Sequence, residues 1–495
     1  MGKNRVAVVG AGLGGLSAAI RLASAGYSVH VFEQRDRPGG KADVLRLGDY
    51  RFDRGPSLLT MPFVFEELFA SAGESMAQYL SFTPLDIHCR YFYNDSTVID
   101  RYSDLNDFSD EIKSKTGSGP DLDEFYAHIK AIYEYTSDIF LYNTPFEKDV
   151  LLRKENILKL SAVYKTDALR SLSKMNEAYF NDSRIIQLFN RYATYNGSSP
   201  YRCPATFGII PYIEEAFGAY NVDGGIYSIT NALFRLAREK GVIFHFNSTV
   251  KRIIIKGRTA EGIALGNTVK NFRRIVINAD VNYCYKNLID NHSLSYQIQK
   301  INEPSSSAFV FYWGIKGGYD ILKTHNILFT RNYRDEFQSI FNSKQICSDP
   351  TIYINITSKY SPSDAPDGCE NWFVMVNVPA DTDKDWRFVK QYMRKIIISK
   401  IKNYTGIDIA DRIETEHSWD PYGIESDTSS RNGSIYGYSS NSLFSAFLRQ
   451  PNRSMDFKGL YFCGGSAHPG GGMPLVVLSG KFVSDIIRSQ DNALD

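Results

Sequence analysis

The first forty-one residues carry the feature that most limits what this chain can fold into. An apolar run over Val6–Val9 leads into the glycine-rich turn Gly10-Ala11-Gly12-Leu13-Gly14-Gly15. The pattern then predicts a helix over Leu16–Ala25 and a second strand over Tyr27–Phe32, which is followed by Glu33. A strand, helix and strand that carry G-x-G-x-x-G, with an acid about 20 residues further on, form the arrangement that binds a dinucleotide.

Each part of this motif has a physical role. Gly10 permits the tight turn off the strand, Gly12 lets the backbone approach a pyrophosphate, and Gly15 lets the helix pack close to the sheet. The N-terminus of the helix favours the phosphate charge, and Glu33 can accept hydrogen bonds from a ribose diol. An NAD-binding unit does not need the following pair Gly39-Gly40, which indicates a second backbone approach and favours FAD over NAD.

The end of the chain carries a second glycine-rich turn. A strand is predicted over Gly459–Gly465, the loop Ser466–Leu475 contains three successive glycines, and a helix is predicted over Val476–Ser489. Such a turn before a helix presents backbone N–H groups and the positive end of a helix dipole. Two sites of this kind at opposite ends of one chain indicate one extended cofactor that is held twice, and FAD is long enough for this.

Length, charge and cysteine usage limit the function classes. A chain of 495 residues can bury a large core and form about two to four domains. The net charge of +1 argues against nucleic acid as a partner, and no apolar run is long enough to predict a spanning helix. The six cysteines are scattered without metal-ligand spacing, so we expect reduced thiols in a cytosolic protein and no metal site.

The middle of the chain is predicted to separate into alternating segments. An FAD-binding domain is expected in three parts, at residues 1–100, 236–300 and 451–495. A helical region is expected at 101–235, and an antiparallel-sheet substrate domain at 301–450. Within the helical region Lys148–Lys174 is amphipathic and basic, which suits either an interfacial membrane helix or a helix packed on its own domain. The many Phe and Tyr residues fit either an ordinary core or an apolar tunnel for a long ligand.

Three motifs together give the chain a family resemblance. The Gly10–Lys41 unit, the loop Asp53-x-Gly55-Pro56 and the loop His468-Pro469-Gly470-Gly471-Gly472-x-Pro474 resemble those of the FAD-dependent carotenoid (phytoene-type) desaturases. The first motif is shared by many relatives of the flavin amine oxidases, whereas the His468–Pro474 loop is more specific to the carotenoid group. The stretch Gly55–Pro62 resembles the hydroxycarotenoid 3,4-desaturases more than the phytoene desaturases.

This resemblance implies a fold, a substrate and a location. The expected fold is α/β, with a Rossmann-like FAD-binding domain of the flavin amine oxidase and GDP-dissociation-inhibitor-like superfamily, an inserted α+β substrate domain and a helical membrane-associating region. The expected substrate is a long apolar carotenoid. The resemblance also implies a monotopic protein of the cytoplasm, peripheral on the inner face of the cell membrane. Oxygen and a membrane quinone are both open as the terminal electron acceptor.

The resemblance also assigns candidate cofactor contacts in the first part of the chain. Residues expected to hold the ADP half of FAD are Gly10, Gly12, Gly14, Gly15 and Glu33, with Gly39 and Gly40 as the second backbone approach. Lys41 is expected to face a phosphate or the flavin edge. Residues expected near the flavin are Ser57, Leu58 and Leu59, for which a purely structural role is the alternative.

Later segments are expected to complete the cofactor site. Val250 is expected to meet the adenine side through its backbone, and Asn278 is expected near the ring system, with a structural role as the alternative. The pair Gly464 and Gly465 is expected at the pyrophosphate or ribityl chain. Gly472 and Met473 are expected against the isoalloxazine.

The expected chemistry does not require a strong protein base. Making a C=C bond removes a hydride and a proton, and the flavin is a competent hydride acceptor. The catalytic residues are therefore unknown from sequence. His468 is a weak candidate proton acceptor, and a hydrogen bond that fixes its loop is the favoured interpretation.

Two further readings of the same motifs remain open. A flavin amine oxidase would need an aromatic pair facing the flavin and a small amine pocket. A non-catalytic isoprenoid-binding protein like the GDP-dissociation inhibitors would lack FAD, which the Glu33 and Gly39-Gly40 features argue against.

Overall fold

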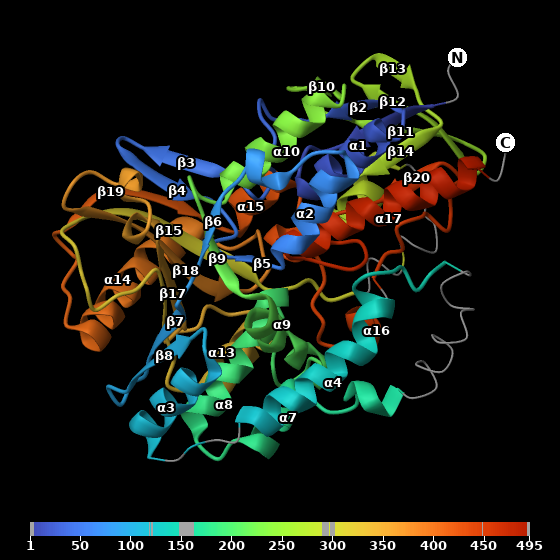
Figure 1. The fold of residues 1–495 in the computed structure, drawn as a ribbon. Coiled ribbons are helices and arrows are strands. Elements are labelled where there is room, and N and C mark those ends of the chain that lie inside the picture. The colour runs from blue at the N-terminus through green and yellow to red at the C-terminus, as the bar shows by residue number, and fades with distance from the viewer. Residues whose placement is uncertain are drawn as a thin grey trace.

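A five-stranded parallel sheet brings together strands from the beginning, the middle and the end of the chain (Figure 1). The computed structural model describes residues 4–117, 119, 122–147, 163–289, 297, 302–447 and 449–492. The strand order is β10-β2-β1-β14-β20, and the strands are β1 (Arg5–Val9), β2 (Ser28–Phe32), β10 (Ile243–His245), β14 (Arg274–Ile277) and β20 (Leu460–Phe462). Every neighbouring pair is parallel, so the predicted Rossmann-like unit is present.

The two faces of this sheet have different covers, because successive side chains of a strand point to opposite faces. Val6 and Val8 lie in a core with three helices, α1 (Leu13–Ser24), α10 (Tyr227–Glu239) and α17 (Met473–Asn492). Ala7 and Val9 lie in a second core with the antiparallel sheet β11-β12-β13, whose strands are Arg252–Lys256, Thr259–Leu265 and Thr268–Asn271. The cofactor layer is thus a sheet between helices and a smaller sheet.

Helix α1 begins at Leu13, earlier than the predicted Leu16, so Gly14 and Gly15 form part of its first turn. Glycine has low helix propensity, which is why the sequence pattern alone placed the start later. Here tertiary packing decides the start. Gly14, in the first turn of α1, lies against the backbone of Gly464 in the second glycine turn and of Val476 in α17.

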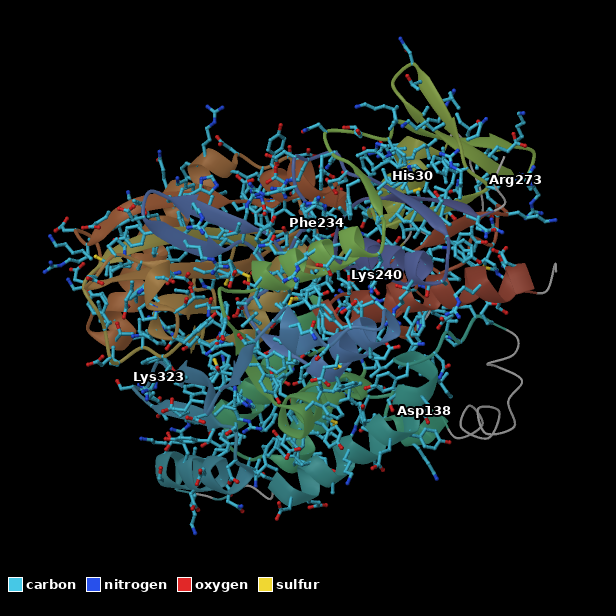
Figure 2. The ribbon with its side chains drawn as sticks, turned by 45° about the horizontal axis from the view of Figure 1, so that its top comes forward. His30, Asp138, Phe234, Lys240, Arg273 and Lys323 are labelled. Carbon is cyan, nitrogen blue, oxygen red and sulfur yellow. The ribbon has the colours of Figure 1, made fainter. Side chains whose placement is uncertain are left out.

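A mixed seven-stranded sheet forms the second layer (Figure 1). Its order is β19-β15-β18-β17-β16-β7-β8, and its strands are β7 (Ile87–Phe92), β8 (Val98–Tyr102), β15 (Ser307–Lys316), β16 (His325–Leu328), β17 (Ile352–Ile356), β18 (Cys369–Val378) and β19 (Ile413–Trp419). Figure 2 shows His30 of β2 and Lys323, just before β16, toward opposite sides of the molecule. The two sheets therefore build two separate parts of the structure.

Strand alternation gives the seven-stranded sheet one face that packs on a helix and a second face that packs in part against Tyr50 and Phe52 and in part lines the site. Phe309, Phe311 and Trp313 of β15 are fully buried in a core with helix α14 (Trp386–Thr405). The alternating neighbours Ala308 and Val310 lie on the other face, which lines a cavity.

Helices cover the end of the sheet at β7, β8 and β16 (Figure 1). They are α3 (Leu105–Thr116), α4 (Leu122–Phe140), α7 (Leu172–Tyr179), α8 (Ser183–Asn190), α9 (Ile209–Phe217) and α13 (Tyr333–Gln338). The elements that connect the layers are α2 (Pro62–Ser71), α15 (Pro421–Thr428), α16 (Leu443–Phe447), the hairpin β3 (Val44–Leu47) and β4 (Tyr50–Asp53), and the small sheet of β5 (Leu59–Thr60), β9 (Ala219–Val222) and β6 (Phe82–Pro84).

Two groups of elements belong to a different part of the fold than the expected segment boundaries assign them to. Strands β7 and β8 fall within residues 1–100 or at their end, yet they pair with β16 of the seven-stranded sheet and not with the cofactor sheet. Helix α10 falls mostly within residues 101–235, yet it packs on α1 of the cofactor layer. The physical reason in both cases is long-range pairing, which local patterns do not contain. Most of the basic stretch Lys148–Lys174 lies outside the described residues, at 148–162.

Two general features of the described chain bear on its class. Among the described residues, no helix combines the length and apolar character that a membrane crossing requires. All six cysteines carry free thiols.

Replacing Gly480 by alanine will weaken the packing of α17 on α1. A Cβ at buried Gly480 would lie 2.5 Å from the carbonyl oxygen of Gly14 and 2.7 Å from Ser17 Cβ. Overpacking of this kind costs about 1–3 kcal/mol, so we expect G480A to melt at a lower temperature than the unchanged protein. Gly119→Ala is the control, because its Cβ would meet only the Lys113 side chain, at 3.8 Å. Equal melting temperatures for G480A and the unchanged protein would contradict this packing.

Candidate functional site

A cavity of about 490 Å³ lies between the two layers and reaches both glycine-rich turns. Its lining includes the carboxyl ends of the parallel strands and the free face of the seven-stranded sheet. Ligands of open α/β sheets bind at this edge of the strands. The cavity therefore joins a nucleotide-type site to a second, sheet-lined chamber.

Most of the residues expected to contact the cofactor line this cavity. They are Gly10, Gly12, Gly14, Glu33, Gly39, Gly40, Lys41, Ser57, Leu58, Val250, Asn278, Gly464, Gly465, Gly472 and Met473. Two of the expected contacts do not line it. Leu59 pairs with Tyr220 of β9 and is buried in the core of the cofactor layer, and Gly15 lies behind the turn. The burial of Leu59 agrees with the structural role that was the alternative for this residue.

The glycine turn after β1 is built by close backbone approaches. Gly10 has φ +98°, a conformation that favours glycine. A Cβ at Gly15 would lie 2.3 Å from the carbonyl oxygen of Gly10, so only glycine lets α1 start this close to the strand. Gly12 is the N-cap and carries no side chain, which leaves the first N–H groups of α1 open to an anion.

Glu33 is held by two backbone donors. Its Oε2 accepts from Ala11 N at 2.7 Å, its Oε1 accepts from Arg35 N at 2.9 Å, and the side chain is buried. Each carboxylate oxygen has a further lone pair, so Glu33 can still accept from a ribose hydroxyl. Ser248 N donates to the Glu33 carbonyl at 2.8 Å, which brings the segment before Val250 beside the acid.

Lys41 is held in place by hydrogen bonds to a segment that is distant in the sequence. Its Nζ donates to the carbonyl oxygens of Ile435 at 2.9 Å and Ser434 at 3.3 Å, which ties the glycine loop to the segment after α15. Burial lowers the pKa of Lys41 to about 8. An ammonium group has three donors, so one remains for a phosphate or flavin atom in the cavity.

Asn278 lies between the two glycine turns. Its Nδ2 donates to the carbonyl oxygen of Gly10 at 3.4 Å, and its Oδ1 accepts from Cys463 Sγ at 3.6 Å. A Cβ at Gly464 would come within 2.9 Å of the same Oδ1. Asn278 therefore holds the two glycine turns together at the edge of the cavity, and its expected place near the ring system stays a prediction.

The C-terminal turn presents a second helix start to the cavity. Gly464 and Gly472 have φ +97° and φ +116°, and α17 begins at Met473. Gly464 N donates to Ser479 Oγ of α17 at 3.2 Å, which fixes the turn on the helix. Both glycine turns thus point helix N-termini toward one cavity, as two phosphates and a ribityl chain would require.

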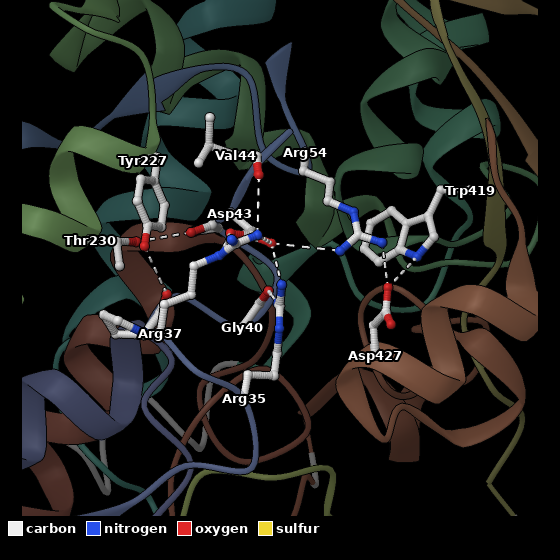
Figure 3. Close-up of polar contacts among 12 residues, drawn as sticks. Arg35, Arg37, Gly40, Asp43, Val44, Arg54, Tyr227, Thr230, Trp419 and Asp427 are labelled. Atoms are coloured by element: carbon white, nitrogen blue, oxygen red, sulfur yellow. Dashed lines mark hydrogen bonds and ion pairs between the residues drawn. The ribbon is translucent and has the colours of Figure 1, made fainter. Parts of the chain in front are cut away.

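A cluster of arginines around Asp43 was not anticipated from the sequence (Figure 3). Asp43 is 1% exposed and accepts from Arg35 Nη2 at 2.6 Å and Arg37 Nε at 3.0 Å, and Arg54 Nη1 lies 3.6 Å away. The hydrogen bonds from the arginines lower the pKa of Asp43 below its usual range, although burial opposes them. Arg35 also donates to the Gly40 carbonyl at 3.3 Å, so the cluster sets the shape of the Gly39-Gly40 loop.

Arg54 links this cluster to the second layer. Its guanidinium pairs with Asp427 and lies 4.4 Å from the centre of the Trp419 ring. Arg35 and Arg54 both line the cavity together with Asp427, so this wall carries paired charges of both signs. The stretch Arg35-Asp36-Arg37 soon after Glu33 is a signal that could have found part of the cluster, but the pairing with Asp43 depends on the fold.

His468 does not line the cavity. Its Nε2 lies 2.9 Å from the carbonyl oxygen of Asn143, its ring packs on Phe146 and Phe482, and burial lowers its pKa to about 4. A neutral imidazole that donates from Nε2 keeps an acceptor lone pair on Nδ1, but the ring lies outside the cavity lining, where a substrate would bind. The geometry therefore does not support the candidate role as proton acceptor, and the hydrogen bond that fixes the loop is present.

The chain is similar to a known protein family, to known relatives and to a solved structure. The family model of flavin containing amine oxidoreductases matches residues 13–488. A 1-hydroxycarotenoid 3,4-desaturase of a Flavobacterium species is 40% identical over 97% of this chain and 98% of the relative. A 4,4'-diapolycopene oxygenase of a Methylomonas species is 34% identical over 98% of both chains. An oxidoreductase of Methanosarcina mazei has a similar solved structure, with TM-score 0.66, 17% identity and coverage of 97% of this chain and 100% of its own.

Replacing Glu33 by glutamine will weaken FAD binding. The substitution exchanges a carboxylate oxygen for an amide NH₂, which cannot accept from Ala11 N or from a ribose hydroxyl. We expect the affinity of the apoprotein for FAD to fall at least about tenfold, which corresponds to about 1.4 kcal/mol. A fluorescence titration with FAD measures it, with Glu239→Gln on the exposed face of α10 as the control. An unchanged affinity in E33Q would remove Glu33 from the nucleotide site.

The free energy of unfolding will fall as the pH drops below about 6.5. Burial lowers the pKa of His88 to about 4, of His325 to about 3 and of His468 to about 4. In the pH range between these values and 6.5 the unfolded chain binds more protons, so acid favours unfolding, by up to about 1.4 kcal/mol per pH unit for each group. Thermal melts from pH 7.5 to 5 should show this slope, and it should flatten in the double variant H88L/H325L. The same slope in both proteins would contradict the assignment.

Proposed function

The chain belongs to the flavin containing amine oxidoreductases, and within that family we propose that it is a carotenoid desaturase, with a 1-hydroxylated carotenoid as its substrate. The observation that carries the proposal is the 40% identity to a 1-hydroxycarotenoid 3,4-desaturase over nearly the full length of both chains. FAD is the cofactor. When bound, it supplies the hydride acceptor that a C–H to C=C oxidation needs.

The residues of the cavity fit FAD. Close approaches at Gly12 and Gly14 leave no room for a side chain, Glu33 can serve a ribose, and Arg35 and Lys41 balance phosphate charge. All of these groups act on binding and orientation. None of them needs to take part in bond breaking.

The second chamber supplies the environment for a polyene. The free face of the seven-stranded sheet presents Val310, Ile327, Phe373 and Met375 to the cavity. Apolar walls exclude water and hold an extended hydrocarbon next to the cofactor loop. The loop residue Ser57 marks where the two chambers meet, because its hydroxyl lies 2.6 Å from the hydroxyl of Tyr353 on β17.

A carotenoid oxygenase is the second candidate. It is supported by the 34% identity to a 4,4'-diapolycopene oxygenase, again over nearly the full length. Phytoene desaturation and amine oxidation keep the same fold with other substrates. A non-catalytic isoprenoid-binding role disagrees with the intact glycine turns and Glu33.

We further propose that the protein works in the cytoplasm on the inner face of the cell membrane, where a carotenoid is dissolved. Leu169 and Phe444 are 81% and 75% exposed, and Leu443 beside it is 43% exposed. Large exposed apolar side chains suit an interfacial surface. Oxygen or a membrane quinone would then reoxidise the flavin.

The proposed function is tested with holoenzyme in detergent or liposomes under anaerobic conditions. A 1-hydroxylated carotene should bleach the flavin absorbance and yield a product with longer-wavelength absorption, because one more double bond extends the conjugation. Phytoene and a primary amine are the parallel substrates. Flavin bleaching by the amine alone would contradict the proposal. In a parallel assay in air, an oxygen-dependent carbonyl product would favour the oxygenase.

A further inference from the structure

A polar cluster lies in the sheet-lined part of the cavity. His88 of β7, His325 of β16 and Arg191 at the end of α8 all line it, and they are only 3%, 3% and 7% exposed. Both ring nitrogens of His88, Nε2 of His325 and Nε of Arg191 have no hydrogen-bond partner within the part of the chain that the structure describes. Buried polar atoms without partners are rare in folded proteins, which points to a ligand at this place.

A β-bulge aims His88 into the cavity. Ile87 pairs with Tyr102 of β8 and Cys89 pairs with Arg101, so His88 is the extra residue between two paired positions. In a regular strand His88 and Cys89 would point to opposite faces, yet both line the cavity. Bulges often redirect a side chain beside a functional site.

His325 is oriented by hydrogen bonds to its other nitrogen. Its Nδ1 lies 2.7 Å from the Tyr353 hydroxyl and accepts from Asn355 Nδ2 at 3.2 Å. The neutral ring therefore carries its proton on Nε2, which is buried and has no acceptor within the part of the chain that the structure describes. The Tyr353 hydroxyl also lies 2.6 Å from Ser57 Oγ. This one hydroxyl therefore connects His325 to the Ser57 loop, which is expected beside the flavin.

Arg191 adds a cation that is held by aromatic rings. Its guanidinium carbon lies 4.6 Å from the ring centre of Tyr192, 5.0 Å from that of Tyr195 and 5.4 Å from that of Tyr91. The nearby carboxylate of Glu214 accepts instead from the hydroxyls of Tyr192 and Tyr195. Donors of Arg191 thus remain for a ligand oxygen.

We propose that His88, Arg191 and His325 bind the hydroxyl group at the end of the carotenoid substrate, an inference that rests on the proposed function. A hydroxyl has one donor and two acceptor positions. It would accept from His325 Nε2 and from the Arg191 guanidinium and donate to a ring nitrogen of His88. These three contacts would satisfy polar groups that are otherwise without partners and would set which carbons face the flavin.

The position of the cluster suits this substrate. In a 1-hydroxylated carotenoid oxidised at carbons 3 and 4, at most three bonds of about 1.5 Å separate the hydroxyl-bearing carbon from the reacting carbons, so the hydroxyl must bind close to the flavin. The Ser57–Tyr353–His325 chain places the polar cluster close to the cofactor loop. A desaturase that acts in the middle of an unsubstituted chain has no use for such a cluster there.

The test compares two substrates in holoenzymes that carry His88→Leu or His325→Leu. The substrates are a 1-hydroxylated carotene and the same carotene without the hydroxyl, and the readout is kcat/KM for flavin reduction, together with FAD content. We expect the ratio of kcat/KM for the hydroxylated over the unhydroxylated substrate to fall at least about tenfold in each variant, with FAD content unchanged. His30→Leu is the control, a partly buried histidine of β2 that lies outside the cavity lining.

The outcomes separate this inference from the proposed function. Equal losses on both substrates would mean a structural role and would overturn the hydroxyl pocket. A wild-type ratio near one would also overturn it, while the desaturase assignment would stand. A wild-type enzyme that oxidises neither carotenoid would overturn the proposed function and the pocket with it.

Discussion

The structure depends on the close approach of two glycine turns to one asparagine side chain. A Cβ at Gly12, Gly14 or Gly464 would lie 2.8–2.9 Å from an atom of the Asn278 side chain, so a side chain at any of these positions would have to displace Asn278. Asn278 N donates to the Val9 carbonyl, and this pairing continues β14 beside β1. The two glycine turns meet at this point, and the helix starts that follow both turns face a single cavity.

The two layers that meet at this junction supply different parts of the site. The cofactor layer supplies backbone donors, Glu33 and a wall of arginines that Asp43 holds in place. The seven-stranded sheet supplies part of an apolar wall, because alternate residues such as Val310 point away from the core that Phe309 and Phe311 form with α14 and line the cavity. A flavin and a long hydrocarbon can therefore meet without water between them.

The sequence predicts the parts of the site that are local. The strand, glycine turn, helix and acid from Val6 to Glu33 obey short-range rules, and most of the glycines assigned to the cofactor line the cavity. What it could not predict depends on distant partners. Lys41 meets carbonyls near residue 435, Asn278 lies between two glycine turns that are far apart in the sequence, and β7 joins a sheet in which every strand except β8 lies more than 200 residues away. The bulge at His88 likewise exists only through its pairing with β8.

A structure of the holoenzyme with a bound 1-hydroxylated carotenoid tests the central claim most directly. The account predicts the FAD pyrophosphate along the Gly10–Gly15 turn and the substrate hydroxyl within hydrogen-bond distance of His325 Nε2, with the polyene against the free face of the seven-stranded sheet. A hydroxyl in solvent at the far end of the cavity, or a polyene outside it, would contradict the account.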